Sequence, residues 1–152
     1  MKINIVAVGK IKEKFFIDAI AEYAKRLSKF CDFKIFEVNE ATSYKNLSEK
    51  SEIEGGLLLN KAKGCIVALD GKGKLFSSEN LAEFINDNMI NGISEISFII
   101  GGSNGLSDNV RNQAKAVVSF GKITFPHQLF RVVLSEQVYR AFTIINGMPY
   151  HK

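Results

Sequence analysis

The sequence predicts an α/β fold with three layers, α/β/α, around a mainly parallel sheet. Short runs of β-branched and apolar residues alternate along the chain with longer segments of helical periodicity, an order typical of parallel sheets covered by helices. Several of the apolar runs end directly in glycine, as in Val8-Gly9 and Ile100-Gly101, which indicates turns that leave strands. No linker or repeat divides the chain, so we expect residues 1–152 to form a single domain.

The first half of the chain contains two predicted strands and two helical patterns. Lys2–Val8 (KINIVAV) predicts a buried strand, and apolar residues at helical spacing predict a helix from about Glu13 to Lys29. A second strand is expected over Asp32–Val38. The region Ala41–Lys63 contains Gly55-Gly56 within a weak helical pattern. Two glycines cost a helix about 2 kcal/mol, so we expect a mobile loop and then a helix that begins or is interrupted there.

The second half opens with two further buried strands, predicted over Cys65–Leu69 (CIVAL) and Ile96–Ile100 (ISFII). Asp70–Lys74 is expected to be the loop that leaves the first of them, followed by a helix capped at Ser77-Ser78. After the glycines that follow the second strand, a helix is expected to begin at Ser107-Asp108. The residues that would give this helix its apolar face are Val110, Ala114 and Val117.

The last quarter, Gly121–His151, predicts a short strand at Ile123–Phe125, a Pro-His turn and a long amphipathic helix that Asn146-Gly147 ends. The apolar face of this helix consists of Phe130, Leu134, Val138, Ala141, Phe142 and Ile145. The segment that follows, Met148–His151, holds a proline, an aromatic ring and a histidine. Two interpretations are open: a tail packed on the core, or a tail that helps build a site.

Composition excludes some classes of function. The chain is 46% hydrophobic and 24% charged, and it has no apolar run of membrane-spanning length, so we expect a cytoplasmic protein. Cys31 and Cys65 lack the spacing of metal ligands, which favours free thiols and no metal. The net charge of +4 permits an anionic partner, but the basic residues are spread out and do not require one.

Ligands of open parallel sheets bind at the carboxyl ends of the strands. Three loops therefore deserve scrutiny: those after Leu69 and after Ile100, and the segment Gly121–His127. Their glycines would let a ligand approach bare backbone amides, although a plain strand-to-helix turn uses the same residues. Nucleotide binding is disfavoured, because Gly71-Lys72-Gly73-Lys74 lacks the spacing of a phosphate loop.

Three sets of residues resemble one known family. The most specific set is the C-terminal series Phe125-Pro126-His127, Arg131-Val132, Leu134, Ser135-Glu136-Gln137, Tyr139-Arg140-Ala141 and Pro149-Tyr150-His151. The other two are Ile100-Gly101-Gly102 with Gly105-Leu106-Ser107, and Val6–Lys10. Together they are similar to the ribosomal RNA large-subunit methyltransferase H family of the SPOUT class, over essentially the whole chain. The resemblance implies a C-terminal trefoil knot and a homodimer in which each site borrows residues from the partner.

The resemblance also implies the reaction. The methyl donor would be S-adenosylmethionine, and the acceptor N3 of a pseudouridine in 23S ribosomal RNA, on assembled ribosomes. It implies no metal and no membrane or DNA partner. The positions that match the family's donor-binding residues are Leu69, Gly102, Gly121, Lys122, Ile123, Thr124, Phe125 and Pro126.

Methyl transfer to an imide nitrogen needs a base, or a cation that stabilises the imide anion. The candidate catalytic residues are His127, His151, Tyr150, Arg131 and Arg140. Either arginine could steer the phosphate or the anionic base, and the ring of Tyr150 could stack on the target base or pack on a second subunit. A lone histidine is often only a structural hydrogen-bonding residue. The alternatives are a SPOUT enzyme that acts on transfer RNA and a non-catalytic protein of RNA binding or ribosome assembly.

Overall fold

Five strands form one fully parallel sheet in the computed structural model, which describes residues 1–152. Their order across the sheet is β2-β1-β4-β3-β5. The strands are β1 (Lys2–Val8), β2 (Asp32–Val38), β3 (Cys65–Leu75), β4 (Glu95–Ile100) and β5 (Ala116–Ser119). The predicted parallel α/β architecture is thus confirmed.

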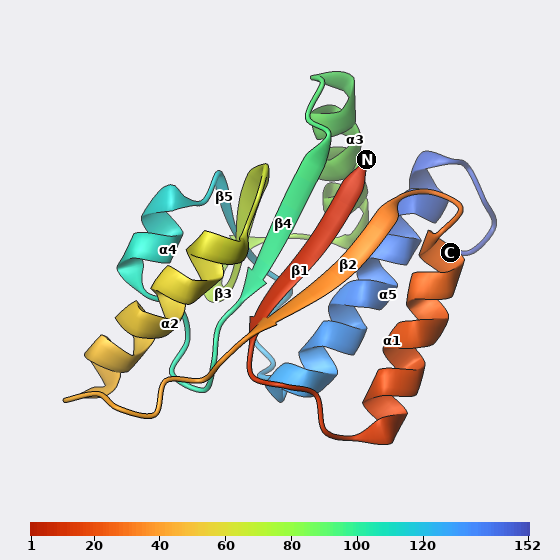
Figure 1. Cartoon of the computed structure of the whole chain (residues 1–152). Helices are drawn as coiled ribbons and strands as arrows, with labels where there is room; N and C mark the ends of the chain where they lie inside the picture. The colour runs from red at the N-terminus through yellow and green to blue at the C-terminus, as the bar shows by residue number, and fades with distance from the viewer.

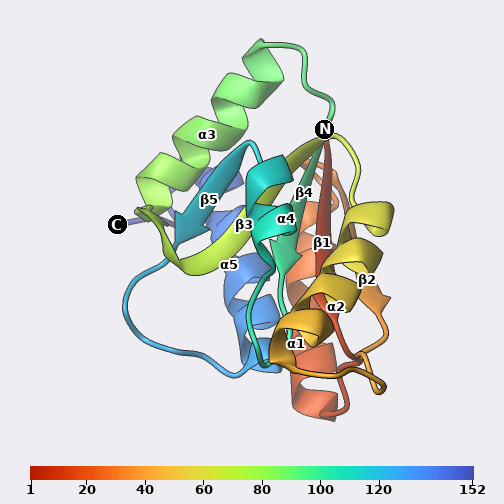
Figure 2. The same ribbon diagram turned by 90° about the vertical axis from the view of Figure 1, so that its left-hand side faces the viewer.

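Helices cover both faces of the sheet, which makes three layers (Figures 1 and 2). One face carries α1 (Lys14–Leu27), α3 (Ser78–Ile90) and α5 (His127–Ile145), and the other carries α2 (Leu47–Lys61) and α4 (Asp108–Gln113). Successive strand residues alternate between the two layers. In β1, for example, the side chain of Ile5 joins the larger core under α1, α3 and α5, whereas Val6 joins the smaller one under α2 and α4.

Helix α2 differs from the prediction, because it begins at Leu47 and runs without a break through Gly55-Gly56. Its amino end is fixed by Asn46, whose side-chain oxygen accepts a hydrogen bond from the amide of Glu49 (2.9 Å). Gly55 is buried where α2 meets α4. A Cβ built on Gly55 would lie 2.5 Å from the Oγ of Ser107, so this glycine permits the close approach of the two helices. Packing therefore overrides the low helix propensity of glycine.

Strand β3 is also longer than predicted. Asp70–Lys74 belongs to the strand, which ends at Leu75 instead of Leu69. Leu69 and Lys74 both pair with Val118 of β5, so the residues between them bulge out of the ladder. Gly73 is needed at this bulge, because a Cβ there would lie 2.6 Å from the backbone of Val117.

The prediction of a strand at Ile123–Phe125 is wrong. These residues have no regular structure, and the fifth strand is Ala116–Ser119. Helix α4 consequently ends at Gln113, and Val117 lies in β5 instead of on that helix. Alternation of apolar residues is hard to recognise in a strand of four residues, so the sequence pattern did not reveal Ala116–Ser119 as a strand.

The end of α5 agrees with the prediction. The helix stops at Ile145, and Gly147 then adopts the left-handed conformation (φ 62°). The amide of Met148 donates to the carbonyl oxygen of Thr143 (2.8 Å), which turns the chain back along the helix. None of the helices is both long enough and apolar enough to cross a membrane.

Candidate functional site

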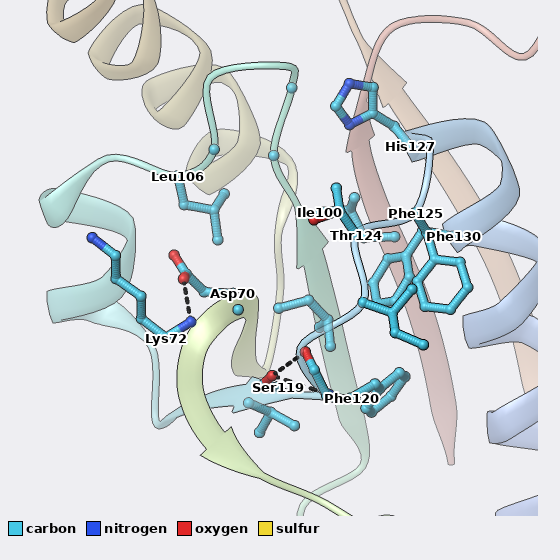
Figure 3. Close-up of a pocket in the computed structure, with 18 of the residues that line it drawn as sticks. Asp70, Lys72, Ile100, Leu106, Ser119, Phe120, Thr124, Phe125, His127 and Phe130 are labelled. Atoms are coloured by element: carbon cyan, nitrogen blue, oxygen red, sulfur yellow. Dashed lines mark hydrogen bonds between the residues drawn. The ribbon is translucent and has the colours of Figure 1, made fainter.

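A cavity of about 500 Å³ lies at the carboxyl ends of β3, β4 and β5 (Figure 3). Three segments far apart in the sequence form its walls, namely residues 69–72, 100–106 and 118–125. Side chains from the first turn of α5 and from α4 complete it: His127, Phe130 and Arg111. This is the edge at which parallel sheets bind ligands, and it is where the sequence predicted a site.

The wall after β4 is a tight glycine turn. The amide of Gly105 donates to the carbonyl oxygen of Gly102 (3.0 Å), and Gly105 has a φ of 75°, which favours glycine. A Cβ on Gly101 would lie 2.8 Å from the backbone of Gly105, so the turn can close only without a side chain there. The amides of Ser103 and Asn104 at its tip donate to no group of the chain. The turn therefore offers hydrogen-bond donors to a ligand.

The wall after β5 is an extended segment that connects the sheet to α5. It is held at its start by Ser119, whose Oγ lies 3.2 Å from both the amide nitrogen and the carbonyl oxygen of Gly121 (Figure 3). Gly121 has a φ of 125°. Phe125 stacks on Phe130 with ring centroids 5.9 Å apart, and Phe120 contacts the same ring at 5.7 Å. These aromatic rings give the cavity an apolar side.

The wall formed by the bulge of β3 is polar. The Asp70 carboxylate accepts a hydrogen bond from the amide of Lys72 (2.9 Å), drawn in Figure 3, and another from the Nε of Arg111 (2.8 Å). Arg111 also pairs with Asp108 (2.9 Å). Because both oxygens of Asp70 are occupied, its contacts hold the rim of the cavity against α4.

Most of the residues predicted to bind a donor line this cavity. They are Leu69, Gly102, Gly121, Lys122, Ile123, Thr124 and Phe125. Pro126 does not line it and instead precedes the first residue of α5. Sequence reasoning missed Asp70, Arg111, Ser119 and Phe120 and assigned Phe130 to the core alone. Asp70 could have been found, because it directly follows the apolar run of β3, whereas β5 was not recognised and so gave no such signal.

His127 is the one candidate catalytic residue that lines the cavity, at the start of α5 (Figure 3). Arg131 lies one turn further along the helix and is only 1% exposed. Its guanidinium group donates to the carbonyl oxygen of Val8 (2.6 Å) and to Glu37 (3.1 Å). Burial lowers the pKa of Arg131, and the nearby charge of Glu37 opposes this shift. Arg131 thus joins α5 to the carboxyl ends of β1 and β2.

The other three candidates form a separate cluster on α5, where the tail folds back. Arg140 pairs with Glu136 (2.6 Å), and the phenol of Tyr150 donates to the same carboxylate (3.0 Å). His151 lies 3.3 Å from Arg140 and 2.7 Å from Glu79 on α3. Burial, followed by the hydrogen bond to Glu136, raises the pKa of Tyr150 to about 12. None of these residues lines the cavity of its own chain.

The chemistry of the cavity suits a small organic ligand with polar edges and an apolar surface. Residues with free amides and aromatic rings both line it, and its volume is within the range of small-molecule pockets, roughly 300–1,000 Å³. No group of three or more histidine, cysteine, aspartate or glutamate side chains is placed to hold a metal ion.

Comparison with known proteins defines the class. A family model described as "Predicted SPOUT methyltransferase" matches residues 1–151. Among solved structures, a "probable methylase family protein" from Haemophilus influenzae superposes with a TM-score of 0.57 at 11% identity, covering 99% of this chain and 70% of its own. The tRNA (m1G37) methyltransferase of Aquifex aeolicus has a TM-score of 0.51 at 13% identity, covering 92% and 70%. The fold and the family model together define a SPOUT methyltransferase.

Closer relatives narrow this class. Proteins named "Ribosomal RNA large subunit methyltransferase H" are 53% identical in Limosilactobacillus reuteri, 48% in Clostridium botulinum and 47% in Streptococcus pneumoniae. Each comparison covers 100% of both chains. The chain therefore belongs to the ribosomal RNA large subunit methyltransferase H family.

Proposed function

We propose that this protein is a cytoplasmic homodimer that transfers the methyl group of S-adenosylmethionine to N3 of a pseudouridine in 23S ribosomal RNA, on assembled ribosomes. Membership of the family supports methyltransferase activity on large-subunit ribosomal RNA. The observation that carries the donor part of the proposal is the cavity at the strand ends, where glycine turns with free amides meet an aromatic wall. The trefoil knot that the resemblance implies belongs to the same proposal.

The cavity residues fit the donor. The amides of Ser103 and Asn104 have no hydrogen-bond partner in the chain and can bond polar edges of an adenosyl group. The rings of Phe125 and Phe130 offer an apolar surface to the same group. When bound, the donor supplies a methyl carbon on a sulfonium, a leaving group that departs as a neutral thioether. The contribution of the protein is alignment of donor and acceptor.

The acceptor nitrogen must lose its proton as the new carbon–nitrogen bond forms. We assign this proton to a histidine, His127 at the cavity or His151 of the tail, because a phenol whose pKa is about 12 is a poor base near neutral pH. Tyr150 then acts as a hydrogen-bond donor or a stacking surface, and Arg140 as the cation nearest to His151. Arg131 is buried and fixes the start of α5, which makes it a positioning residue.

A homodimer would reconcile the two separate groups of candidates. In one chain the tail cluster lies outside the cavity, although both belong to the motif that defines the resemblance. A tail supplied by a second copy would bring His151 and Tyr150 to the cavity of its partner. A single chain has a net charge of only +4 and therefore little basic surface. The same pairing would double the basic surface available to ribosomal RNA.

The proposal is tested by binding and by transfer. Calorimetry should show that the protein binds S-adenosylmethionine, and the variant Thr124→Trp, which fills the cavity, should bind it at least tenfold more weakly. Mass spectrometry of nucleosides should show one new methylated pseudouridine in ribosomes from a strain that lacks the mark. Methylation of transfer RNA alone would overturn the assigned substrate. RNA binding without methyl transfer would instead favour a role in ribosome assembly.

A further inference from the structure

Glu54 of α2 is a buried carboxylate with an unused oxygen. The residue is 1% exposed. One oxygen, Oε1, accepts a hydrogen bond from the amide of Ala41 (3.1 Å) and lies 3.9 Å from the Nζ of Lys50. The other, Oε2, is buried and has no hydrogen-bond partner. Buried polar atoms in native proteins are nearly always paired, so a buried carboxylate oxygen without a partner is unusual.

The unpaired oxygen lies at the wall of the cavity. A Cβ built on Gly102 would be 2.8 Å from Oε2 of Glu54, so the absence of a side chain at Gly102 leaves room for the carboxylate. Gly102 also lines the cavity. The carboxylate of Glu54 therefore lies directly behind a residue that lines the cavity.

Glu54 and the charged side chains that form ion pairs around it carry a net negative charge. Lys50 is 7% exposed at its side chain and bonds Glu40 (2.7 Å), whose own side chain is 57% exposed. Glu40 thus offsets the positive charge of Lys50, and the three groups together carry a net charge of −1. The field of a buried charge is weakly screened by solvent and salt, so the carboxylate of Glu54 acts on the cavity at short range.

We propose that Glu54 is a specificity-determining residue that favours a cationic ligand over its neutral counterpart in the cavity. The inference rests on the proposed function, because the sulfonium donor carries one more positive charge than the thioether that remains after methyl transfer. The two molecules are otherwise nearly identical in shape. A negative charge behind Gly102 would hold the donor and release the spent product, which has lost the charge that the carboxylate attracts.

The test compares the affinities of S-adenosylmethionine and S-adenosylhomocysteine by calorimetry at mildly alkaline pH. In Glu54→Gln, which keeps the shape and removes the charge, the preference for the cationic donor should fall about fivefold or more relative to wild type. Glu54→Asp should retain part of the preference. Glu52→Gln is the matched control, because Glu52 lies on the same helix, is exposed and forms no ion pair, and it should leave the ratio unchanged.

A second variant moves the ratio in the opposite direction without touching Glu54. Lys50→Gln removes the positive charge 3.9 Å from the carboxylate and should increase the preference for the donor. A purely structural role of Glu54 predicts that both ligands weaken equally in Glu54→Gln, and that result would overturn the inference while the proposed function stands. Failure of the wild-type protein to bind either ligand would overturn the proposed function and the inference with it.

Discussion

Individual residues at the two ends of α5 show how charge is handled in this molecule. Arg131 is the bulkiest of the fully buried side chains. Its buried charge is stabilised by hydrogen bonds to the carbonyl oxygen of Val8 and to the carboxylate of Glu37. Breaking a buried pair of this kind leaves an uncompensated charge and is strongly destabilising. At the other end, His151 pairs with Glu79 at the surface, where a pair contributes little to stability but fixes the direction of the tail.

The pair between Glu79 and His151 gives a prediction for acid stability. The amide of Glu79 itself, followed by His151 and Ser77, donates to the carboxylate and lowers its pKa from 4.5 to about 2. Between these values the unfolded chain binds the proton and the folded chain does not, so stability must fall as the pH falls through this window. Thermal unfolding followed by circular dichroism should show a steeper loss in wild type than in Glu79→Gln.

Glu83→Gln, a change at an exposed position of the same helix, should leave the slope of wild type unaltered. Parallel curves for wild type and Glu79→Gln would mean that the pKa of this carboxylate is not lowered in the folded protein.

The residue-level features differ in how far the sequence could predict them. Tyr150 and His151 were predicted as candidates because they end the C-terminal series of residues that carries the family resemblance. The burial of Arg131 was not predictable, since Arg131 is not one of the apolar residues of the helix face. The carbonyl group that it bonds belongs to Val8, 123 residues earlier in the chain. No motif or periodic pattern in the sequence indicated a role for Glu54. Its position behind Gly102 depends on how α2 packs on the sheet, which no local pattern encodes.

Among the elements, α2 shows how tertiary packing decides local structure. The two glycines at its centre weaken the helix by propensity, yet they have different surroundings. Gly55 is pressed against Ser107 and Val110 of the α4 region, while a Cβ on Gly56 would meet no atom within 4 Å. Ser107 cannot easily move away, because its Oγ accepts the hydrogen bond from the amide of Val110 that caps α4 (3.3 Å).

Substitution of the two glycines should therefore have opposite effects. Gly56→Ala should raise the free energy of unfolding by about 0.5–1 kcal/mol, since alanine restricts the unfolded chain and fits the helix. Gly55→Ala should lower it by about 1–3 kcal/mol, because the methyl group displaces the cap of α4. Urea denaturation measures both. An equal gain in the two variants would contradict the close contact between α2 and α4.

The elements that the sequence predicted well are those with a strong local pattern. The apolar runs of β1 and β4 and the periodic face of α5 suffice to locate them, because burial on both faces or on one stripe demands such patterns. The second half of β3 and the four residues of β5 failed for the opposite reason. Gly71 and Gly73 look like a loop, and only pairing with β5 makes this stretch a strand.

At the scale of the whole molecule, the proposed function treats the cavity and the tail cluster of one chain as two half-sites. The cavity has donors for a ligand and an aromatic wall, and the tail has the second histidine and the phenol of Tyr150. A symmetric dimer would join each cavity to the tail of the other copy, and a C₂ interface would do so twice. The family resemblance indicated the residues of both the cavity and the tail. Sequence periodicity, however, contains no information on the interface between two copies of the chain.

Mixed dimers test this arrangement. Thr124→Trp blocks the cavity and the double variant Tyr150→Ala with His151→Ala removes the tail, so each alone should be inactive in methyl transfer. Co-expressed, the two should recover roughly a quarter of wild-type activity, because half of the dimers would then contain one intact composite site of two. Mass spectrometry of the intact dimers verifies that mixed species form. Mixed dimers without activity would place the complete site within one chain.

The bulge of β3 has a mechanical consequence for turnover. Because Leu69 and Lys74 both pair with Val118, the polar segment between them is held to β5 at both ends, which restricts its movement. In the proposed reaction, exchange of the spent for the fresh methyl donor would use movement of another wall, Gly121–Phe125, which pairs with no strand. The cavity would thus have one fixed wall and one movable wall, and donor exchange would depend on the segment that leads into α5.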